Sequence, residues 1–170
     1  MPYTSILIVE DGTGVANANS YNSLAEIRAY AVLRGVVLSS VDQTLDVLAI
    51  TGMDWLEYKK EWYGEKTSST QSLQWPRNRI RIDGEVFPYN EIPTLLKKAH
   101  CQLVVDQSNG ITLTPDSSGN EPYVTEETIG PITTKYSGYL RTSRYPSLPI
   151  VESFLKQLCR NNGIIKVDRA

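Results

Sequence analysis

A long stretch of apolar residues at helical spacing, in the first half of the chain, constrains the fold more than any other sequence feature. Apolar residues and one glycine recur every three to four positions over about six helical turns. The repeat consists of Val41, Leu45, Leu48, Gly52, Trp55, Leu56 and Trp62. It predicts one helix that begins near Ser40 and Gln43 and ends at Gly64. A glycine inside a helix costs about 1 kcal/mol relative to alanine, so we expect Gly52 to mark close contact with another helix.

Three further helices are predicted from residues that start and stop helices. Their ranges are 24–34, 93–108 and 148–160. Ser23 and Glu26 form a capping box before the first, and Pro93 opens the second. The predicted fold is therefore mainly α: a small four-helix bundle with long loops, extended arms and short strands, in one domain over residues 1–170.

Two long segments, at about 66–90 and 111–145, lack a helical period. Asp83-Gly84 predicts a turn in the first, and Gly130-Pro131 divides a predicted hairpin near 124–136 in the second. A short strand is expected at 5–9, followed by a turn at Gly12 and Gly14. Connections of this length usually make functional contacts, so both segments and the tail 161–170 are predicted to be flexible or docking segments.

The composition excludes several kinds of chemistry. Lys and Arg total 17 against 19 Asp and Glu, for a formal charge of −2, which disfavours a dedicated nucleic-acid coat. The chain has one histidine, His100, and two cysteines, Cys101 and Cys159, which form neither a disulfide framework nor a zinc pattern. We expect His100 on the surface or in an interface, and both cysteines packed as small apolar residues. No catalytic motif, metal site, cofactor site or membrane-spanning segment is predicted.

One basic cluster contains an aromatic residue and has no acidic residue between 66 and 82. It consists of Lys66, Trp75, Arg77, Arg79 and Arg81. The alternation of the three arginines predicts a short strand with one charged face. Three roles remain open: a protein interface, which is favoured, a solvated strand, or a surface that binds single-stranded nucleic acid by charge and stacking.

A second set of aromatic and basic residues lies in the later irregular segment. It comprises Tyr123, Tyr136, Tyr139, Arg141 and Arg144. Such a segment can dock a partner by adding a strand to the edge of a neighbouring sheet. It can equally fold over the core of its own domain, because monomers rarely expose aromatic patches.

Several short motifs occur along the chain in a fixed order. They are Glu10-Asp11-Gly12-Thr13-Gly14-Val15-Ala16-Asn17-Ala18-Asn19-Ser20-Tyr21, Lys66-Thr67 with Gln71-x-Leu73-x-Trp75-Pro76-Arg77, Glu91-Ile92-Pro93, and Gly130-Pro131-Ile132. Together they resemble a family of small tailed-phage and prophage proteins labelled DnaT-like single-stranded DNA-binding. That family is also similar to the head–tail connector, or adaptor, proteins of tailed phages. The chain departs from the usual pattern at about 111–122 and after residue 161.

The adaptor resemblance implies a structural protein of the virion neck, assembled in the host cytoplasm. It implies a homo-oligomeric ring, dodecameric in that class, which contacts the portal protein and a tail-side neck protein or tail terminator. The genome would pass through the bore, with non-specific DNA contact there, and no catalytic residue or cofactor is implied. The modest charge and the long polar–aromatic segments favour this function. The alternative is a single-stranded DNA-binding or replication accessory protein.

Overall fold

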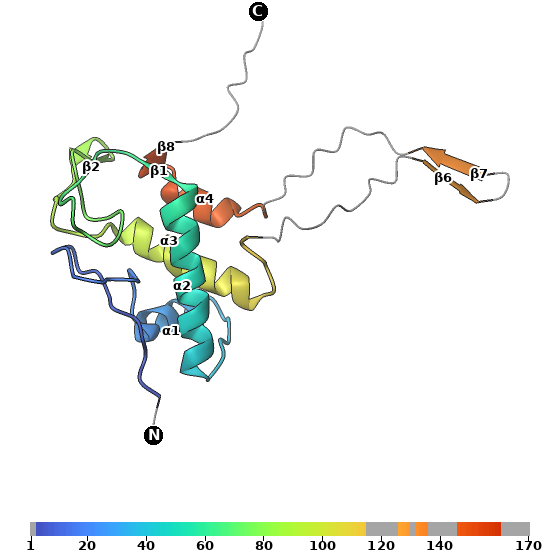
Figure 1. Ribbon diagram of the computed structural model, residues 1–170, viewed down its shortest axis with the longest axis horizontal. Helices are drawn as coiled ribbons and strands as arrows, with labels where there is room; N and C mark the ends of the chain where they lie inside the picture. The colour runs from blue at the N-terminus through green and yellow to red at the C-terminus, as the bar shows by residue number, and fades with distance from the viewer. Residues whose placement is uncertain (1–2, 115–125, 130–131, 136–145, 161–170) are drawn as a thin grey trace, which may run out of the picture.

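The computed structural model describes residues 3–114, 126–129, 132–135 and 146–160, and for the two short middle segments only the backbone pairing. Four helices lie in this part of the chain (Figure 1). They are α1 (Leu24–Val32), α2 (Asp42–Lys59), α3 (Thr94–Ser108) and α4 (Pro149–Leu155). All four lie close to predicted helices, but α2 and α4 are each shorter than predicted.

Short strands in the described segments form four antiparallel pairs. These are β1 (Glu61–Trp62) with β8 (Cys159–Arg160), β2 (Glu65–Lys66) with β3 (Arg77–Asn78), β4 (Arg81–Ile82) with β5 (Glu85–Val86), and β6 (Glu126–Ile129) with β7 (Ile132–Lys135). The predicted four-helix bundle is therefore wrong, and the fold is a small mixed α/β structure. The physical reason is that α4 has only 7 residues and the extended segment 61–87 fills part of the core instead.

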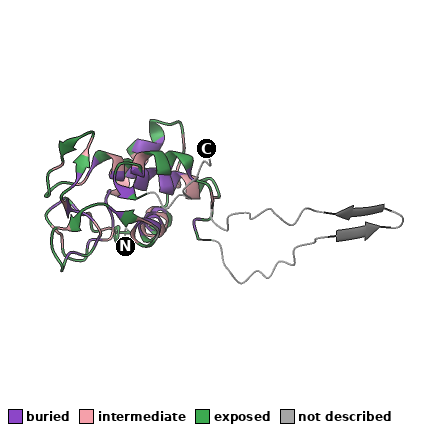
Figure 2. Ribbon diagram, turned by 90° about the horizontal axis from the view of Figure 1, so that it is seen from above, coloured by how far each residue is buried: buried purple, intermediate pink, exposed green. Residues whose placement is uncertain are grey.

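Helix α3 is the centre of the packing, because it contacts α1, α2 and α4. One core cluster joins α1, α2 and α3 through side chains such as Ile27, Leu45 and Val104. A larger cluster joins α3 and α4 to the segment 61–87, where Trp75 and Ile80 are buried. Figure 2 shows the buried residues gathered inside this body and the exposed residues on its loops.

Some helices begin or end at residues that favour a helix end locally, and others end because the chain pairs with a distant strand. Ser23 and Glu26 form the predicted capping box, in which each side chain binds the other residue's backbone N–H. Helix α2 ends at Lys59 rather than Gly64, because residues 61–62 leave the helix to pair with β8. The same pairing ends α4 before residue 160. Helix α2 begins at Asp42, between Ser40 and Gln43 as predicted, but its N-cap is Val41, and no side chain caps it.

The predicted strand at 5–9 is also wrong. This segment forms only an isolated bridge from Val9 to Ser20. Side chains satisfy its backbone instead: Ile6 N–H donates to Asp46, and Ile8 N–H donates to Asn19. The predicted turn at Asp83-Gly84 is confirmed, since both residues have positive φ between β4 and β5, as a tight hairpin turn requires. The predicted segment 161–170 lies outside the described residues.

Gly52 lies where α2 meets α3, as expected. A Cβ atom there would lie 3.4 Å from Leu103 Cβ and 3.5 Å from both Gln107 Nε2 and His100 Cδ2. These are ordinary contact distances, so Gly52→Ala should fit. It should raise the free energy of unfolding by about 0.5–1 kcal/mol through helix propensity.

Gly52→Val serves as the contrasting variant because it adds two more methyl groups to the same contact. It should lower the free energy of unfolding by about 1–3 kcal/mol through overpacking. Urea denaturation of both variants measures the difference. A loss of stability in Gly52→Ala would contradict the packing distances.

Candidate binding groove

The segment 61–87 is built on a row of aromatic rings. Trp75 is 0 % exposed, and it packs edge-on against Trp62 and against Phe87, with 6.1 Å between ring centroids in each pair. The Trp75 backbone N–H donates to the Tyr21 hydroxyl at 3.2 Å. This row anchors an otherwise irregular segment to the body of the protein.

Arg77 holds the segment together from inside. Its Nε donates to the Tyr63 carbonyl at 2.7 Å, and its Nη2 donates to the Gly64 carbonyl at 2.8 Å. Its Nη1 donates to the backbone carbonyl of Gln74 at 3.1 Å and to its side-chain oxygen at 3.0 Å. Burial lowers the pKa of this guanidinium. Arg77 is thus a structural residue that fixes the position of Tyr63.

The predicted strand through the three arginines is interrupted at its middle. Arg79 has φ +60°, which ends β3 and lets β4 begin in a new direction. Arg77 is therefore buried, while Arg79 and Arg81 are exposed. The prediction of one strand with a single charged face is wrong, because a left-handed residue changes the direction of the chain.

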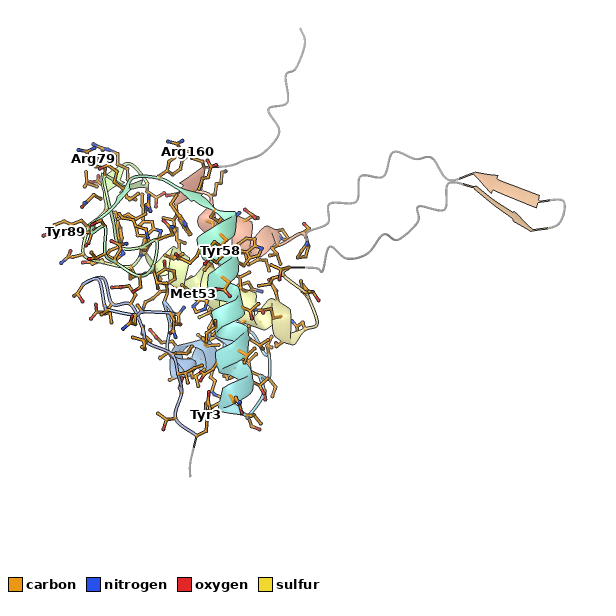
Figure 3. All side chains as sticks on the ribbon, in the orientation of Figure 1. Tyr3, Met53, Tyr58, Arg79, Tyr89 and Arg160 are labelled. Carbon is orange, nitrogen blue, oxygen red and sulfur yellow. The ribbon has the colours of Figure 1, made fainter. Side chains whose placement is uncertain are left out.

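Arg79 and Arg81 border an open groove of about 650 Å³. Its lining comprises Tyr63, Arg79, Ile80, Arg81, Val86 and Gln157, together with the glycine that follows Tyr63. Tyr63 is 43 % exposed and Val86 is 67 % exposed, so an aromatic ring and an aliphatic side chain face solvent there. Figure 3 shows Arg79 and Arg160 at this end of the molecule.

Positive and negative charges nearly balance around the groove, and its two arginine side chains interact only weakly with their neighbours. Arg79 Nη1 lies 2.9 Å from a Glu65 carboxylate oxygen, and these side chains are 77 % and 66 % exposed. A pair so exposed contributes little and is easily exchanged for another partner. Arg81 donates to the Gly84 carbonyl at 2.8 Å. Both guanidinium groups are therefore accessible to an anionic partner.

The far wall of the groove is fixed by a reciprocal pair of hydrogen bonds. The Asp83 N–H donates to Gln157 Oε1 at 3.1 Å, and Gln157 Nε2 donates to Asp83 Oδ1 at 2.8 Å. These hydrogen bonds tie the β4–β5 turn to the residues that follow α4. The groove is consequently assembled from two parts of the chain far apart in sequence.

A second pocket, of about 330 Å³, lies along α2 and includes Lys66 in its wall. Its half-buried carboxylate, Glu57, already accepts from the Tyr21 hydroxyl at 2.9 Å and from the Gln74 N–H at 2.8 Å. Burial raises the pKa of Glu57 and raises that of Tyr21 well above its ordinary value. Because these polar groups already bind each other, the pocket has fewer free polar groups for a ligand than the groove has.

The structure separates the residues of the predicted basic cluster. Arg79 and Arg81 lie together in the groove, Lys66 lines the second pocket, and Trp75 and Arg77 are buried beneath. The other predicted interface residues lie outside the described residues: Tyr123, Tyr136, Tyr139, Arg141 and Arg144.

Val86 and Gln157 are not among the residues that the sequence predicts for a site, whereas Tyr63 flanks the predicted basic cluster. The Asp83-Gly84 turn was the local signal available, because a hairpin there places Val86 opposite Arg81. The residues around Gln157 in the sequence give no sign that its side chain binds this hairpin.

The single histidine, predicted on the surface or in an interface, is instead fully buried within the protein. Both cysteines are free and buried, as predicted. In the part of the chain that the structure describes, no group of three His, Cys, Asp or Glu residues could hold a metal ion. Within that same part, no helix has the length and apolar character needed to cross a membrane.

Comparison with known proteins identifies a family. The family model described as "Putative DnaT-like ssDNA binding protein" matches residues 5–170. No curated protein and no solved structure matches the chain. The family match supports the DnaT-like part of the resemblance seen in the sequence and carries no indication of a phage neck role. Since the match extends over nearly the whole chain, this protein belongs to that DnaT-like family.

Proposed function

We propose that this chain binds single-stranded DNA in the groove beside Arg79 and Arg81. The observation that carries the proposal is an exposed tyrosine beside two accessible guanidinium groups, in a chain that belongs to a DnaT-like family. Proteins bind single strands without sequence preference by combining cationic side chains with aromatic rings on which bases stack. The groove contains both components.

Each side chain has a distinct role in this proposal. The Tyr63 ring stacks on a base, while Arg79 and Arg81 bind the neighbouring phosphates. Trp75 and Arg77 do not touch the strand, because they are buried. Arg77 holds the Tyr63 backbone in position. Among the described residues, two cations line the groove, and the chain has a net charge of −2, so the affinity should be modest and its salt dependence shallow.

Fluorescence anisotropy of a labelled oligothymidine over a salt series tests the proposal. Arg79→Ala with Arg81→Ala should weaken binding and reduce the slope of log K against log salt by about 1.4, or about 0.7 for each phosphate that is no longer neutralised. Tyr63→Ala should weaken binding and leave the slope unchanged, because stacking is uncharged.

A matched control removes two cations elsewhere. Arg34 is exposed beyond the end of α1, and Lys98 lies on α3; neither lines the groove. Arg34→Ala with Lys98→Ala should preserve binding and its slope. An equal reduction of affinity in this control would show that binding is not located in the groove, and absence of any salt-dependent binding would refute the function.

A structural subunit of a phage neck is the second candidate. Val32 at the end of α1 is 73 % exposed, and Leu33 and Val37 in the loop to α2 are 84 % and 94 % exposed. Exposed apolar surface of this kind favours assembly with other protein. Electron microscopy of purified particles tests it by asking whether this chain forms a symmetric layer beneath the portal. Absence of the chain from the particles would reject this candidate.

A further inference from the structure

Arg160 is a cation at the edge of the groove that the proposed function does not use. Gln157 lines the groove, and Arg160 follows three residues later in β8. Three residues of extended chain span at most about 10 Å, so the two Cα atoms lie within that distance. Arg160 is exposed, and Figure 3 shows it at the same end of the molecule as Arg79. It therefore lies where a DNA strand bound in the groove can continue.

The pairing of β1 with β8 places Arg160 on the same face as Tyr63. Trp62 lies opposite Cys159 in this pair, and both are buried, with 7 % and 5 % exposed. Side chains alternate between the two faces of a strand, so the next residue along each strand points to solvent. These next residues are Tyr63 and Arg160, and both are exposed. The Tyr63 N–H donates to the Leu158 carbonyl at 3.1 Å, which makes Arg160 its diagonal neighbour across the ladder, within reach of a long side chain.

Tyr63 thus has arginines on two bordering segments: Arg160 on β8, and Arg79 with Arg81 in the groove. We propose that Arg160 is a third phosphate-binding residue of the DNA site. A single strand then extends from Arg160 across the Tyr63 ring into the groove. Because a base stacked on Tyr63 has a phosphate on its 5′ side and another on its 3′ side, arginines on both segments can bind phosphates. Three phosphates join about four nucleotides, so the substrate is a single strand of at least that length.

Two glutamates next to Tyr63 compete with DNA for these arginines. Glu61 lies directly opposite Arg160 in the β1–β8 register. Glu65 lies 2.9 Å from Arg79. Both glutamates are exposed, and each is two residues from Tyr63. A phosphate that binds either guanidinium must displace a carboxylate, so removal of Glu61 should strengthen binding.

This inference rests on the proposed function, because it adds a residue to the same site. Fluorescence anisotropy of a labelled oligothymidine over a salt series tests it. Arg160→Ala should weaken binding about threefold, the size of one exposed ion pair, and should reduce the slope of log K against log salt by about 0.7. Lys156→Ala is the matched control, because Lys156 is exposed, lies four residues earlier and lines a different pocket. It should leave affinity and slope unchanged.

The length of the strand provides a second readout. Unlabelled oligothymidines of two and four nucleotides compete with the labelled strand. The tetranucleotide should compete better against the wild type, because it can bind arginines on both segments. This advantage should be smaller in Arg160→Ala, and an equal advantage in both proteins would overturn the inference.

A double-mutant cycle with Glu61→Gln separates direct contact from a general charge effect. Glu61→Gln should strengthen binding about twofold in the wild type, and this gain should largely disappear in Arg160→Ala. Circular dichroism confirms that each variant is folded.

The outcomes distinguish this inference from the proposed function. Loss of binding in Arg79→Ala with Arg81→Ala, together with wild-type binding in Arg160→Ala, would overturn the role of Arg160 and leave the groove as the DNA site. Equal effects of Arg160→Ala and Lys156→Ala would also overturn it, because the effect would then be one of overall charge. Absence of any salt-dependent binding would refute both the role of Arg160 and the proposed function.

Discussion

Trp75→Ala should lower the free energy of unfolding by about 3–5 kcal/mol, the range for removing a large aromatic side chain from a core. The ring is completely buried between Trp62 and Phe87, so its removal leaves a cavity. The substitution also removes both edge-on aromatic pairs, each worth about 0.5–1.5 kcal/mol beyond area burial. Urea denaturation followed by circular dichroism measures the change.

Two comparison variants separate this effect from a surface effect. Trp75→Phe keeps an aromatic ring and removes a buried indole N–H that has no partner among the described residues, so it should cost clearly less than alanine. Tyr89→Ala removes a ring that is largely exposed, and it should change stability by less than about 0.5 kcal/mol. If Trp75→Ala cost no more than Tyr89→Ala, the position of Trp75 in the core would be wrong.

Acidification from pH 7 to pH 4 should cost about 3 kcal/mol of stability through His100 alone. The ring is fully buried: Nε2–H donates to the Ala49 carbonyl at 3.0 Å and Nδ1 accepts from Asn22 Nδ2 at 3.0 Å. This arrangement needs the neutral ring, and burial lowers the pKa of His100 from 6.5 to about 4. Lowering the pKa from 6.5 to about 4 corresponds to about 3 kcal/mol.

The sign follows from which state binds the proton. Between pH 6.5 and pH 4 the unfolded chain protonates its histidine and the folded chain does not, so stability falls as pH falls. Below about pH 4 both states are protonated and this destabilisation stops growing. Carboxylates titrate in the same range, and therefore a His100 variant is needed to isolate the contribution of the ring.

His100→Gln is a suitable variant because its amide can donate to Ala49 and accept from Asn22. The difference in unfolding free energy between the wild type and this variant should shrink or reverse by about 3 kcal/mol from pH 7 to pH 4. The chain has one histidine, so its ring proton signal in NMR is unambiguous, and it should not titrate above about pH 5. Titration near 6.5 would contradict the buried position.

Burial of particular residues was the feature that sequence reasoning predicted least well. Trp75 and Arg77 stand in a polar, basic stretch that is typical of a contact surface. They are buried because Tyr21 and the Tyr63–Gly64 backbone, distant in sequence, supply hydrogen-bond partners. His100 is buried for the same kind of reason, since Asn22 and Ala49 satisfy its ring.

The groove, too, depends on residues that are distant in sequence. The sequence marks Arg79 and Arg81 as a basic pair and Asp83-Gly84 as a turn. It does not show that Arg79 adopts a left-handed conformation, or that Gln157 closes one wall. The predicted aromatic and basic residues at 123–144 lie outside the described residues, so their role stays a prediction.

The sequence by itself determined the features that depend on neighbouring residues. The capping box at Ser23, the turn at Asp83-Gly84 and the glycine where two helices meet follow from steric and hydrogen-bonding preferences within a few positions. Only the tertiary structure decided that residues 61–62 pair with β8, which shortens α2 and α4 and replaces the expected bundle by a mixed fold. The reason is that strand pairing and burial depend on partners about a hundred residues apart, and no local pattern encodes them.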